Sequence, residues 1–206
     1  MKTILLHGLG QMPSSWNETV KYMEEQKDIV ILDLFALTKD KSMNYNELYN
    51  AFVEYCISLH EPLNLCGLSL GGILALQFTI EYPKVVNSLI LIGARYNVPK
   101  TLFKIQNAVF KVMPNKSFTQ MGIEKADFIS LSKSMIDIDL ENDLKSIQCR
   151  TLVICGEKDK ANLKASQELQ NKISNAEILI IENANHEVNL DNPQKLATSI
   201  NSFVDQ

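Results

Sequence analysis

The chain has 206 residues, of which 46% are hydrophobic and 21% charged, and its net charge is -4. This length fits one domain with a substantial core, and the small acidic excess argues against nucleic-acid binding, which uses basic patches. The N-terminus lacks the layout of a signal peptide, and no apolar stretch is long enough to span a bilayer. We therefore expect a cytoplasmic protein without a membrane span.

Short apolar runs predict six β-strands along the chain. In order they are Thr3–Leu6, Ile29–Leu32, Leu63–Cys66, Val86–Ile92, Thr151–Cys155 and Ala176–Ile181. Their hydrophobicity is continuous rather than alternating, which is typical of strands buried on both faces. Helices are expected between most of them, at Ser14–Glu25, Tyr45–Leu59, Leu70–Tyr82, Ala165–Lys172 and Gln194–Val204. Alternating strands and helices predict an α/β fold, with a mostly parallel sheet and helices on both faces.

The segment Arg95–Gln148 interrupts this alternation, because it contains no convincing strand. It reads as two or three helices, roughly Thr101–Met113, Glu124–Met135 and Leu140–Ile147. We predict a core of residues 1–94 and 149–206 and a small helical cap of residues 95–148; the alternative is one extra layer of packing helices. The apolar residues of this segment either line an acyl pocket or pack the cap, and they include Leu102, Phe103, Ile105, Phe110, Met113, Phe128 and Met135.

One motif points to a specific chemistry. Residues 67–71 read Gly-Leu-Ser-Leu-Gly, a G-x-S-x-G pattern between a predicted strand and a predicted helix. A serine on such a tight turn has a strained backbone, and its neighbours two positions away must be small. The turn lifts the hydroxyl clear of the sheet, at a helix N-terminus that favours developing negative charge. We therefore predict that Ser69 is a nucleophile.

A serine hydroxyl needs a base to act as a nucleophile. His186 follows the last predicted strand, and Asp159 follows the fifth, so both emerge at carboxyl ends of strands, where ligands bind in open α/β sheets. The chain order Ser69, Asp159, His186 is the order that this motif uses on such sheets. We predict that His186 is the base and that Asp159 holds its useful tautomer.

The loop after the first strand reads His7-Gly8-Leu9-Gly10. A backbone N–H from this loop and the N–H of the residue after the nucleophile form the usual oxyanion hole of such sites, so we predict Leu9 and Leu70 as the donors. We expect His7 to be structural, bracing the loop by a side-chain hydrogen bond. His60, at a helix end, is expected on the surface.

These pieces together resemble the α/β-hydrolase superfamily, within its broad group of small esterases and lipase-like serine hydrolases. The matching residues are 7–10, 67–72, 82–83, 156–159 and 185–186, which span nearly the whole chain. The resemblance implies the triad and the two oxyanion donors at the residues already given. It also implies a cap between the sixth and seventh strands of the family, which matches Arg95–Gln148.

The chain departs from the family pattern in two places. It begins at the equivalent of the third family strand, so we expect a shortened N-terminal side without the first antiparallel hairpin. The segment after Asp33 usually resembles a glycine-rich loop, but residues 34–38 here read Leu-Phe-Ala-Leu-Thr. The contacts of this loop with a substrate therefore do not follow from the resemblance.

Other site classes fit the sequence less well. A dinucleotide site would use Gly8, Gly10 and Asp33, but Pro13 stands where the third glycine belongs. A metalloprotease motif fails because Leu190, and not a second histidine, completes the spacing from His186. The four cysteines form no C-x-x-C pair, which leaves zinc without support and predicts reduced, mostly buried thiols. We expect no cofactor and no metal.

The sequence therefore predicts a serine hydrolase that cleaves a small carboxylic ester or thioester through an acyl-enzyme on Ser69. Two alternatives stay open, because a fold does not determine a reaction. The same triad serves C–C and cyanohydrin lyases, and a hydrolase-like protein can act as a non-catalytic ligand receptor. The expected partner is a small-molecule acyl ester or thioester, and no motif specifies its acyl length or the oligomeric state.

Overall fold

The computed structural model describes residues 1–24, 26–38 and 43–204, with the backbone alone described at 27, 101, 102 and 104–106. Its sheet has six strands, whose bounds are β1 Lys2–Leu6, β2 Ile29–Leu32, β3 Leu63–Leu68, β4 Val86–Ile92, β5 Arg150–Gly156 and β6 Ala176–Ile181. The order is β2-β1-β3-β4-β5-β6, and every described pairing is parallel. All six predicted strands are confirmed. Because they are parallel, their carboxyl ends meet at one edge of the sheet.

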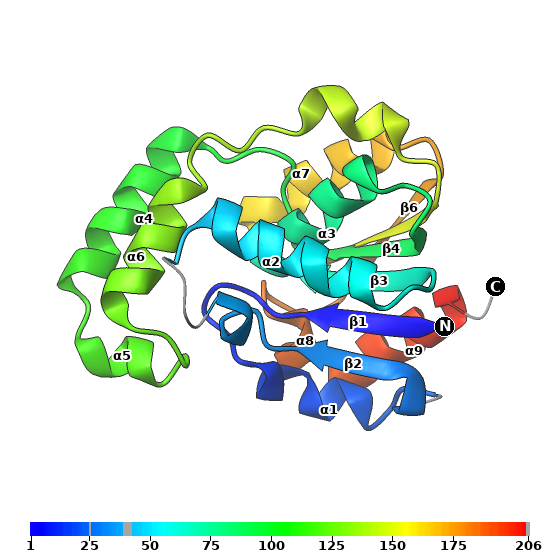
Figure 1. Cartoon of the computed structure of the whole chain (residues 1–206), viewed down its shortest axis with the longest axis horizontal. Helices are drawn as coiled ribbons and strands as arrows, with labels where there is room; N and C mark the ends of the chain where they lie inside the picture. The colour runs from blue at the N-terminus through cyan, green and yellow to red at the C-terminus, as the bar shows by residue number, and fades with distance from the viewer. Residues whose placement is uncertain (25, 39–42, 205–206) are drawn as a thin grey trace.

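Helices cover both faces of the sheet, as the sequence predicts (Figure 1). One face packs on α2 (Tyr45–Ser58), α3 (Leu70–Glu81) and α7 (Lys160–Lys172), and the other on α1 (Asn17–Val20), α8 (Val188–Asp191) and α9 (Pro193–Val204). Successive strand residues point to opposite faces. Ile4 and Leu6 accordingly join the first cluster and Leu5 the second, and all three are fully buried. The continuous apolar runs arise because both faces are covered.

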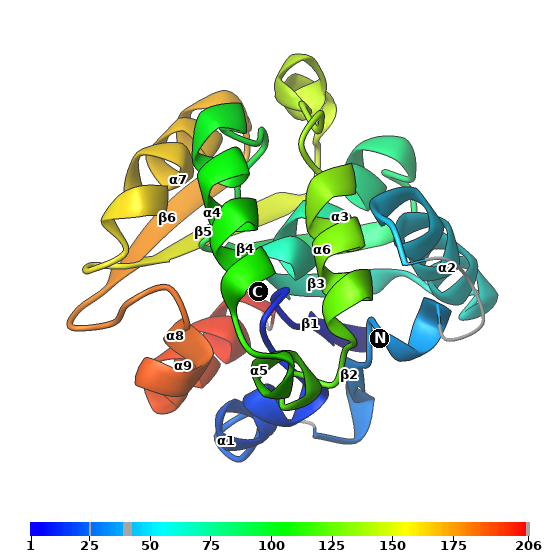
Figure 2. The ribbon, with the colours of Figure 1, turned by 90° about the vertical axis from the view of Figure 1, so that its left-hand side faces the viewer.

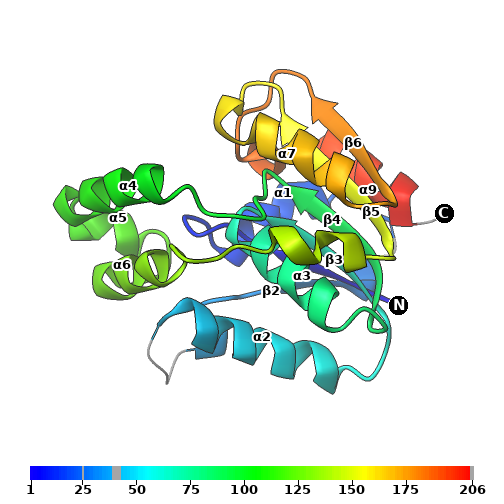
Figure 3. The ribbon, with the colours of Figure 1, turned by 90° about the horizontal axis from the view of Figure 1, so that it is seen from above.

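The segment between β4 and β5 forms a separate group of helices, α4 (Lys100–Val112), α5 (Asn115–Thr119) and α6 (Lys125–Ser134). Figures 1 and 3 show this group beyond the edge of the sheet toward which the strand arrows point, and in Figure 2, which looks onto that edge, the group lies in front of the sheet. Its two connections pair with each other, since Leu140 N–H donates to Tyr96 O at 2.8 Å and Val98 N–H to Ile138 O at 3.2 Å. The two segments that connect these helices to the sheet are therefore hydrogen-bonded to each other.

Several predicted helix bounds need correction. The expected helix Ser14–Glu25 is wrong in extent, because a 3₁₀ turn (η1, Pro13–Trp16) and the one-turn α1 replace it, and Glu25 lies outside the described residues. Both Trp16 and Met23 are buried in the same core cluster, and this packing overrides a weak helical preference. The predicted helix Leu140–Ile147 is a 3₁₀ helix, η4 (Glu141–Ser146).

Three further helices differ from the predicted elements. Helix α7 begins at Lys160, five residues earlier than predicted, because Asp159 caps it, and α5 and α8 were not predicted. The shorter 3₁₀ elements are η2 (Gln26–Asp28) and η3 (Ala36–Thr38).

Across the described residues, no helix combines the length and apolar character that crossing a membrane requires. The four cysteines carry free thiols, three of them buried.

Candidate active site

Ser69 lies on the turn between β3 and α3, at the carboxyl edge of the sheet. Its backbone has φ 53° and ψ -110°, in the left-handed half of conformational space that non-glycine residues rarely occupy. The Ser69 N–H donates to Ile92 O of the adjacent strand at 2.9 Å, which fixes the turn against β4. A strained residue held by its surroundings at the end of a strand is a common feature of functional sites.

The two glycines of the motif are required for different steric reasons. A Cβ on Gly67 would collide with the backbone of Gly71, across the turn, as the sequence predicts. A Cβ on Gly71, however, would lie 2.5 Å from Leu6 O, in the neighbouring strand β1. The second glycine therefore allows the helix to approach the sheet rather than opening the turn itself, and only the tertiary structure shows this difference.

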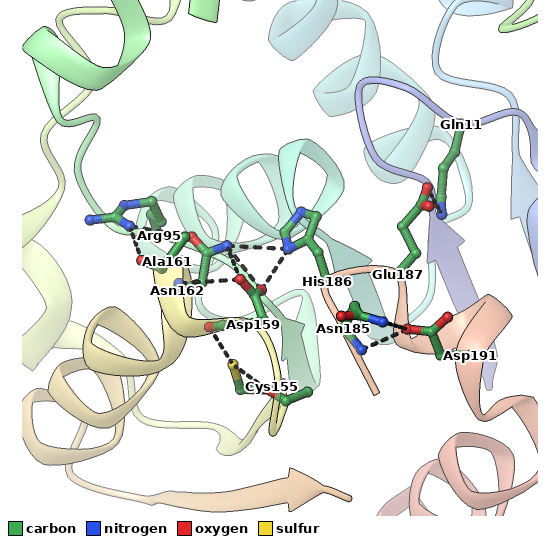
Figure 4. Close-up of polar contacts among 11 residues, drawn as sticks. Gln11, Arg95, Cys155, Asp159, Ala161, Asn162, Asn185, His186, Glu187 and Asp191 are labelled. Carbon is green, nitrogen blue, oxygen red and sulfur yellow. Dashed lines mark hydrogen bonds and ion pairs between the residues drawn. The ribbon is translucent and has the colours of Figure 1, made fainter. Parts of the chain in front are cut away.

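His186 and Asp159 come together from two loops at the same edge. His186 Nδ1 lies 2.7 Å from Asp159 Oδ2, with the imidazole side chain 37% exposed and the carboxylate only 5% exposed (Figure 4). Asp159 is also the N-cap of α7, where its Oδ1 accepts from Asn162 N–H at 3.3 Å. The helix start thus fixes the carboxylate that orients the imidazole.

The ionisation of Asp159 depends on its neighbours. Burial by itself opposes the charged form, but the hydrogen bonds from His186 and Asn162 outweigh it, so the pKa of this carboxyl is lowered. Asn162 Nδ2 reaches both carboxylate oxygens, at 3.0 and 2.9 Å. An ionised Asp159 accepts a hydrogen bond from the Nδ1–H of His186. Nε2 is then the nitrogen of this ring that is able to take up a proton.

Two glycines outside the motif make room for this pair. Gly93, just after β4, has φ 53°, and a Cβ there would lie 2.9 Å from His186 Nδ1 and 3.3 Å from Asp159 Oδ2. A Cβ on Gly156 would collide with the carbonyls of Ala184 and Asn185, in the loop that carries the histidine. Sequence reasoning missed Gly93, although a glycine directly after a buried strand was a signal available to it.

A cavity of about 410 Å³ opens beside these residues. Ser69, Asp159 and His186 all line it, together with Leu9 and Leu70, so the structure brings the five predicted site residues to one cavity. No hydrogen bond joins Ser69 to His186 among the described residues. Of the seven apolar residues singled out in the segment 95–148, Phe103 and Met135 line the cavity.

The remaining apolar cap residues have other positions. Phe110 and Phe118 pack edge-on against Phe128, with ring centroids 4.8 and 5.0 Å away, inside the helical segment. Met113 packs against the first core cluster. The side chains of Leu102 and Ile105 lie outside the described part of the structure.

The other two histidines have the positions that the sequence predicts. His7 is fully buried; Leu34 N–H donates to its Nε2 at 3.2 Å, and its Nδ1 lies 2.9 Å from Gly8 O. Burial is the main reason why the pKa of His7 is lowered, so a neutral ring braces the loop. His60 is exposed, at the end of α2.

Sequence reasoning also missed two polar residues at the site. Asn162 contacts both Asp159 and His186, and Gln11 joins the Leu9 loop to the segment after His186. An asparagine three residues after a helix cap and a glutamine in a glycine-rich loop are ordinary residues in a sequence. No spacing pattern could have distinguished them.

A parallel sheet with a strained serine at its edge and a histidine–carboxylate pair beside it is the arrangement of α/β-hydrolase folds. A family model described as "Alpha/beta hydrolase family" matches residues 3–199. The chain belongs to this family.

Named relatives agree with this membership, and a solved structure shares the fold. Human monoacylglycerol lipase ABHD6 is 21% identical over 251 residues, covering 98% of this chain and 74% of the relative. A pimeloyl-[acyl-carrier protein] methyl ester esterase from Wigglesworthia glossinidia brevipalpis is 24% identical over 241 residues, covering 98% and 92%. The structure of an esterase from Exiguobacterium antarcticum aligns with a TM-score of 0.85 at 18% identity, covering 100% of this chain and 92% of that one. At this identity the structural likeness concerns the fold.

Proposed function

We propose that this protein is a serine hydrolase that cleaves a small carboxylic ester or thioester through an acyl-enzyme on Ser69. One observation carries the proposal: the hydrogen-bonded pair of His186 and Asp159 lines the same cavity as a serine held at φ 53°. Two relatives are named for ester cleavage, a monoacylglycerol lipase and a methyl ester esterase. Their names support an ester over other hydrolase substrates.

The chemistry follows from the roles of the three side chains. Ser69 Oγ attacks the carbonyl carbon of the ester while Nε2 of His186 takes the hydroxyl proton. The resulting imidazolium is stabilised by Asp159, whose lowered pKa keeps it ionised. Collapse of the tetrahedral adduct breaks the bond to the alcohol or thiol, which leaves with the proton from His186. Water then attacks the acyl-enzyme by the same route, releasing the acid and the free serine.

Two backbone N–H groups suit the charge that forms on the carbonyl oxygen. The N–H of Leu70 is the first of α3 and has no acceptor within that helix, and both Leu9 and Leu70 line the cavity. Among the described residues, Leu9 N–H donates to no backbone carbonyl. We assign the oxyanion hole to these two donors. Residues 95–148 act as the cap, since Phe103 and Met135 from this segment close the cavity.

Covalent labelling tests the nucleophile. A fluorophosphonate should add one label, seen as a single mass increase, and Ser69→Ala should remove it. A burst of nitrophenolate from a p-nitrophenyl ester should precede steady turnover, because with such an activated ester the acyl-enzyme forms faster than it is hydrolysed. Labelling that persists in Ser69→Ala would contradict the assignment. Release of an aldehyde or ketone without an acyl-enzyme would instead identify a lyase, and ligand binding without a burst would identify a receptor.

A further inference from the structure

Arg95 lies at the same cavity as the proposed triad. It follows β4 by three residues and lines the cavity together with Ser69 and His186. Apart from it, the described lining is mainly apolar, with Ile73, Val98 and Phe103 among its members. Among the lining residues whose side chains the structure describes, Arg95 is the one permanent cation. A charge in such a place determines which substrates the cavity accepts.

The guanidinium of Arg95 is held in place by uncharged acceptors. Its Nη1 donates to Ala161 O at 2.8 Å and to Asn162 Oδ1 at 3.3 Å, at the start of α7 (Figure 4). Both acceptors are uncharged. Among the described carboxylates none lies within salt-bridge distance of Arg95. A half-buried arginine without a direct salt bridge is unusual, because buried charges are normally paired.

A second donor of Arg95 has no acceptor among the described residues. Its Nε is buried and has no hydrogen-bond partner among the described residues. Unsatisfied buried donors are uncommon, so this guanidinium has hydrogen-bonding capacity that the described residues do not use. A guanidinium presents its N–H groups as a rigid planar fork that matches the two oxygens of a carboxylate. The held Nη1 orients this fork before any ligand arrives, which reduces the cost of ordering it.

We propose that Arg95 binds a carboxylate of the substrate, so that the preferred ester or thioester carries a second, free carboxylate besides the group that is cleaved. The proposal rests on the function proposed above. A cavity of about 410 Å³ is in the range of small-molecule sites and suits an acyl chain of a few carbons with an acidic end. Arg95 is a specificity residue here, and the attack on the carbonyl does not involve it.

Matched esters test the proposal. Mono-p-nitrophenyl adipate carries a terminal carboxylate, and its terminal amide has the same shape without the charge. We expect kcat/KM to favour the carboxylate by about ten- to a hundredfold, as for hydrogen bonds to charged groups. A second pair, 4-carboxyphenyl hexanoate and 4-carbamoylphenyl hexanoate, places the charge in the alcohol. The pair with the larger preference shows which part of the substrate Arg95 contacts.

Variants then assign the preference to this residue. Arg95→Met should remove it, Arg95→Lys should restore part of it, and thermal melting should show that both proteins fold. Arg150→Met is the control, because Arg150 is the other arginine of the chain and starts β5, at the opposite end of the sheet. It removes the same charge and should leave the preference unchanged. A preference that survives in Arg95→Met, or an equal loss for the charged and amide esters, would overturn the proposal.

A binding measurement separates this proposal from the proposed function. In the Ser69→Ala protein, calorimetry should detect adipate, and Arg95→Met added to it should weaken the affinity at least about tenfold. Adipamide should bind weakly in both proteins. If Ser69 is not the nucleophile, the fluorophosphonate label persists in Ser69→Ala and the proposed function is wrong. The adipate measurement still decides the role of Arg95, because it does not depend on turnover. If adipate and adipamide bind equally, Arg95 only tethers the chain to α7 and the proposal is wrong.

Discussion

The amide groups of Gln11 and Asn189 exchange two hydrogen bonds across 178 positions of the chain. Gln11 Nε2 donates to Asn189 Oδ1 at 3.1 Å, and Asn189 Nδ2 donates to Gln11 Oε1 at 3.3 Å. Both side chains are buried. Gln11 also accepts from Gly8 N–H at 3.4 Å and donates to Glu187 at 3.0 Å. The pair therefore links the loop of the proposed oxyanion donor Leu9 to the segment that follows His186.

We expect Gln11→Met to damage both stability and turnover. It leaves buried partners unsatisfied, which costs about 1–3 kcal/mol, and at about 2–4 °C per kcal/mol the melting temperature should fall measurably. Slight displacement of the two loops should lower kcat by about ten- to a hundredfold. The exposed Gln26, whose side chain bonds Val20 O, supplies the control Gln26→Met, with little effect on either quantity. Additive effects of Gln11→Met and Asn189→Leu in a double-mutant cycle would show that the two amides are not coupled.

Gly93→Ala should separate backbone strain from site geometry. The added Cβ would lie 2.9 Å from His186 Nδ1, so we expect the imidazole to shift and kcat/KM for p-nitrophenyl acetate to fall by about a hundredfold. Gly122→Ala is matched to it, because Gly122 also has a positive φ, 74°, but faces the flexible side chain of Met12. Both variants should lose about 1–2 kcal/mol of stability. Equal activity in the two variants would mean that Gly93 is needed only for its backbone conformation and not to make room for His186.

Asp159→Asn should leave a folded protein with very low turnover. The amide cannot stabilise the imidazolium, and in the serine-protease template this change costs up to about ten-thousand-fold in kcat. Steady-state kinetics with p-nitrophenyl acetate and a melting curve measure the two quantities. Glu157→Gln is the control, since Glu157 is exposed and accepts from Asn183 N–H at 2.9 Å, away from the imidazole. Near-normal turnover in Asp159→Asn would show that this carboxylate is not the group that supports the imidazole.

His7 should make the protein less stable in mild acid. Burial lowers the pKa of its ring, so the folded chain holds a neutral His7 where the unfolded chain takes up a proton. The unfolded state then binds more protons, and stability falls as the pH drops below about 6.5, the ordinary histidine value. Melting temperatures between pH 7 and pH 5 should fall less in His7→Gln than in the parent. His60→Asn, at an exposed histidine, should keep the parental slope. Identical slopes in all three proteins would contradict this role of His7.

Phe103→Ala should change the preferred acyl length. Phe103 lines the cavity, and each methylene in an apolar pocket is worth about 1–3 kcal/mol, which is tenfold to a few hundredfold in relative kcat/KM. Acetate esters, which are too short to reach the cap, should be affected least. Phe128→Leu is the comparison, because Phe128 is buried against Phe110 and Phe118 rather than in the cavity. A panel of p-nitrophenyl esters measures both, and an equal change across the panel in Phe103→Ala would identify this residue as scaffold.

The strands, most of the helices and the elbow around Ser69 could be predicted because they depend on local features of the sequence. Buried parallel strands need unbroken apolar runs, and a strand-to-helix turn as tight as this one needs Gly67. Asp159 and His186 could also be located, because carboxyl ends of parallel strands meet at one edge whatever the side chains between them.

The contacts between segments that lie far apart in the sequence were decided only by the tertiary structure. Gly93 matters because a loop 93 positions later places His186 against it, and Gln11 matters because Asn189 lies beside it. Within residues 95–148, only the tertiary structure shows that Phe103 lines the cavity while Phe128 packs against Phe110 and Phe118. Local spacing contains no record of such contacts, since close packing selects partners by shape and position in space rather than by distance along the chain.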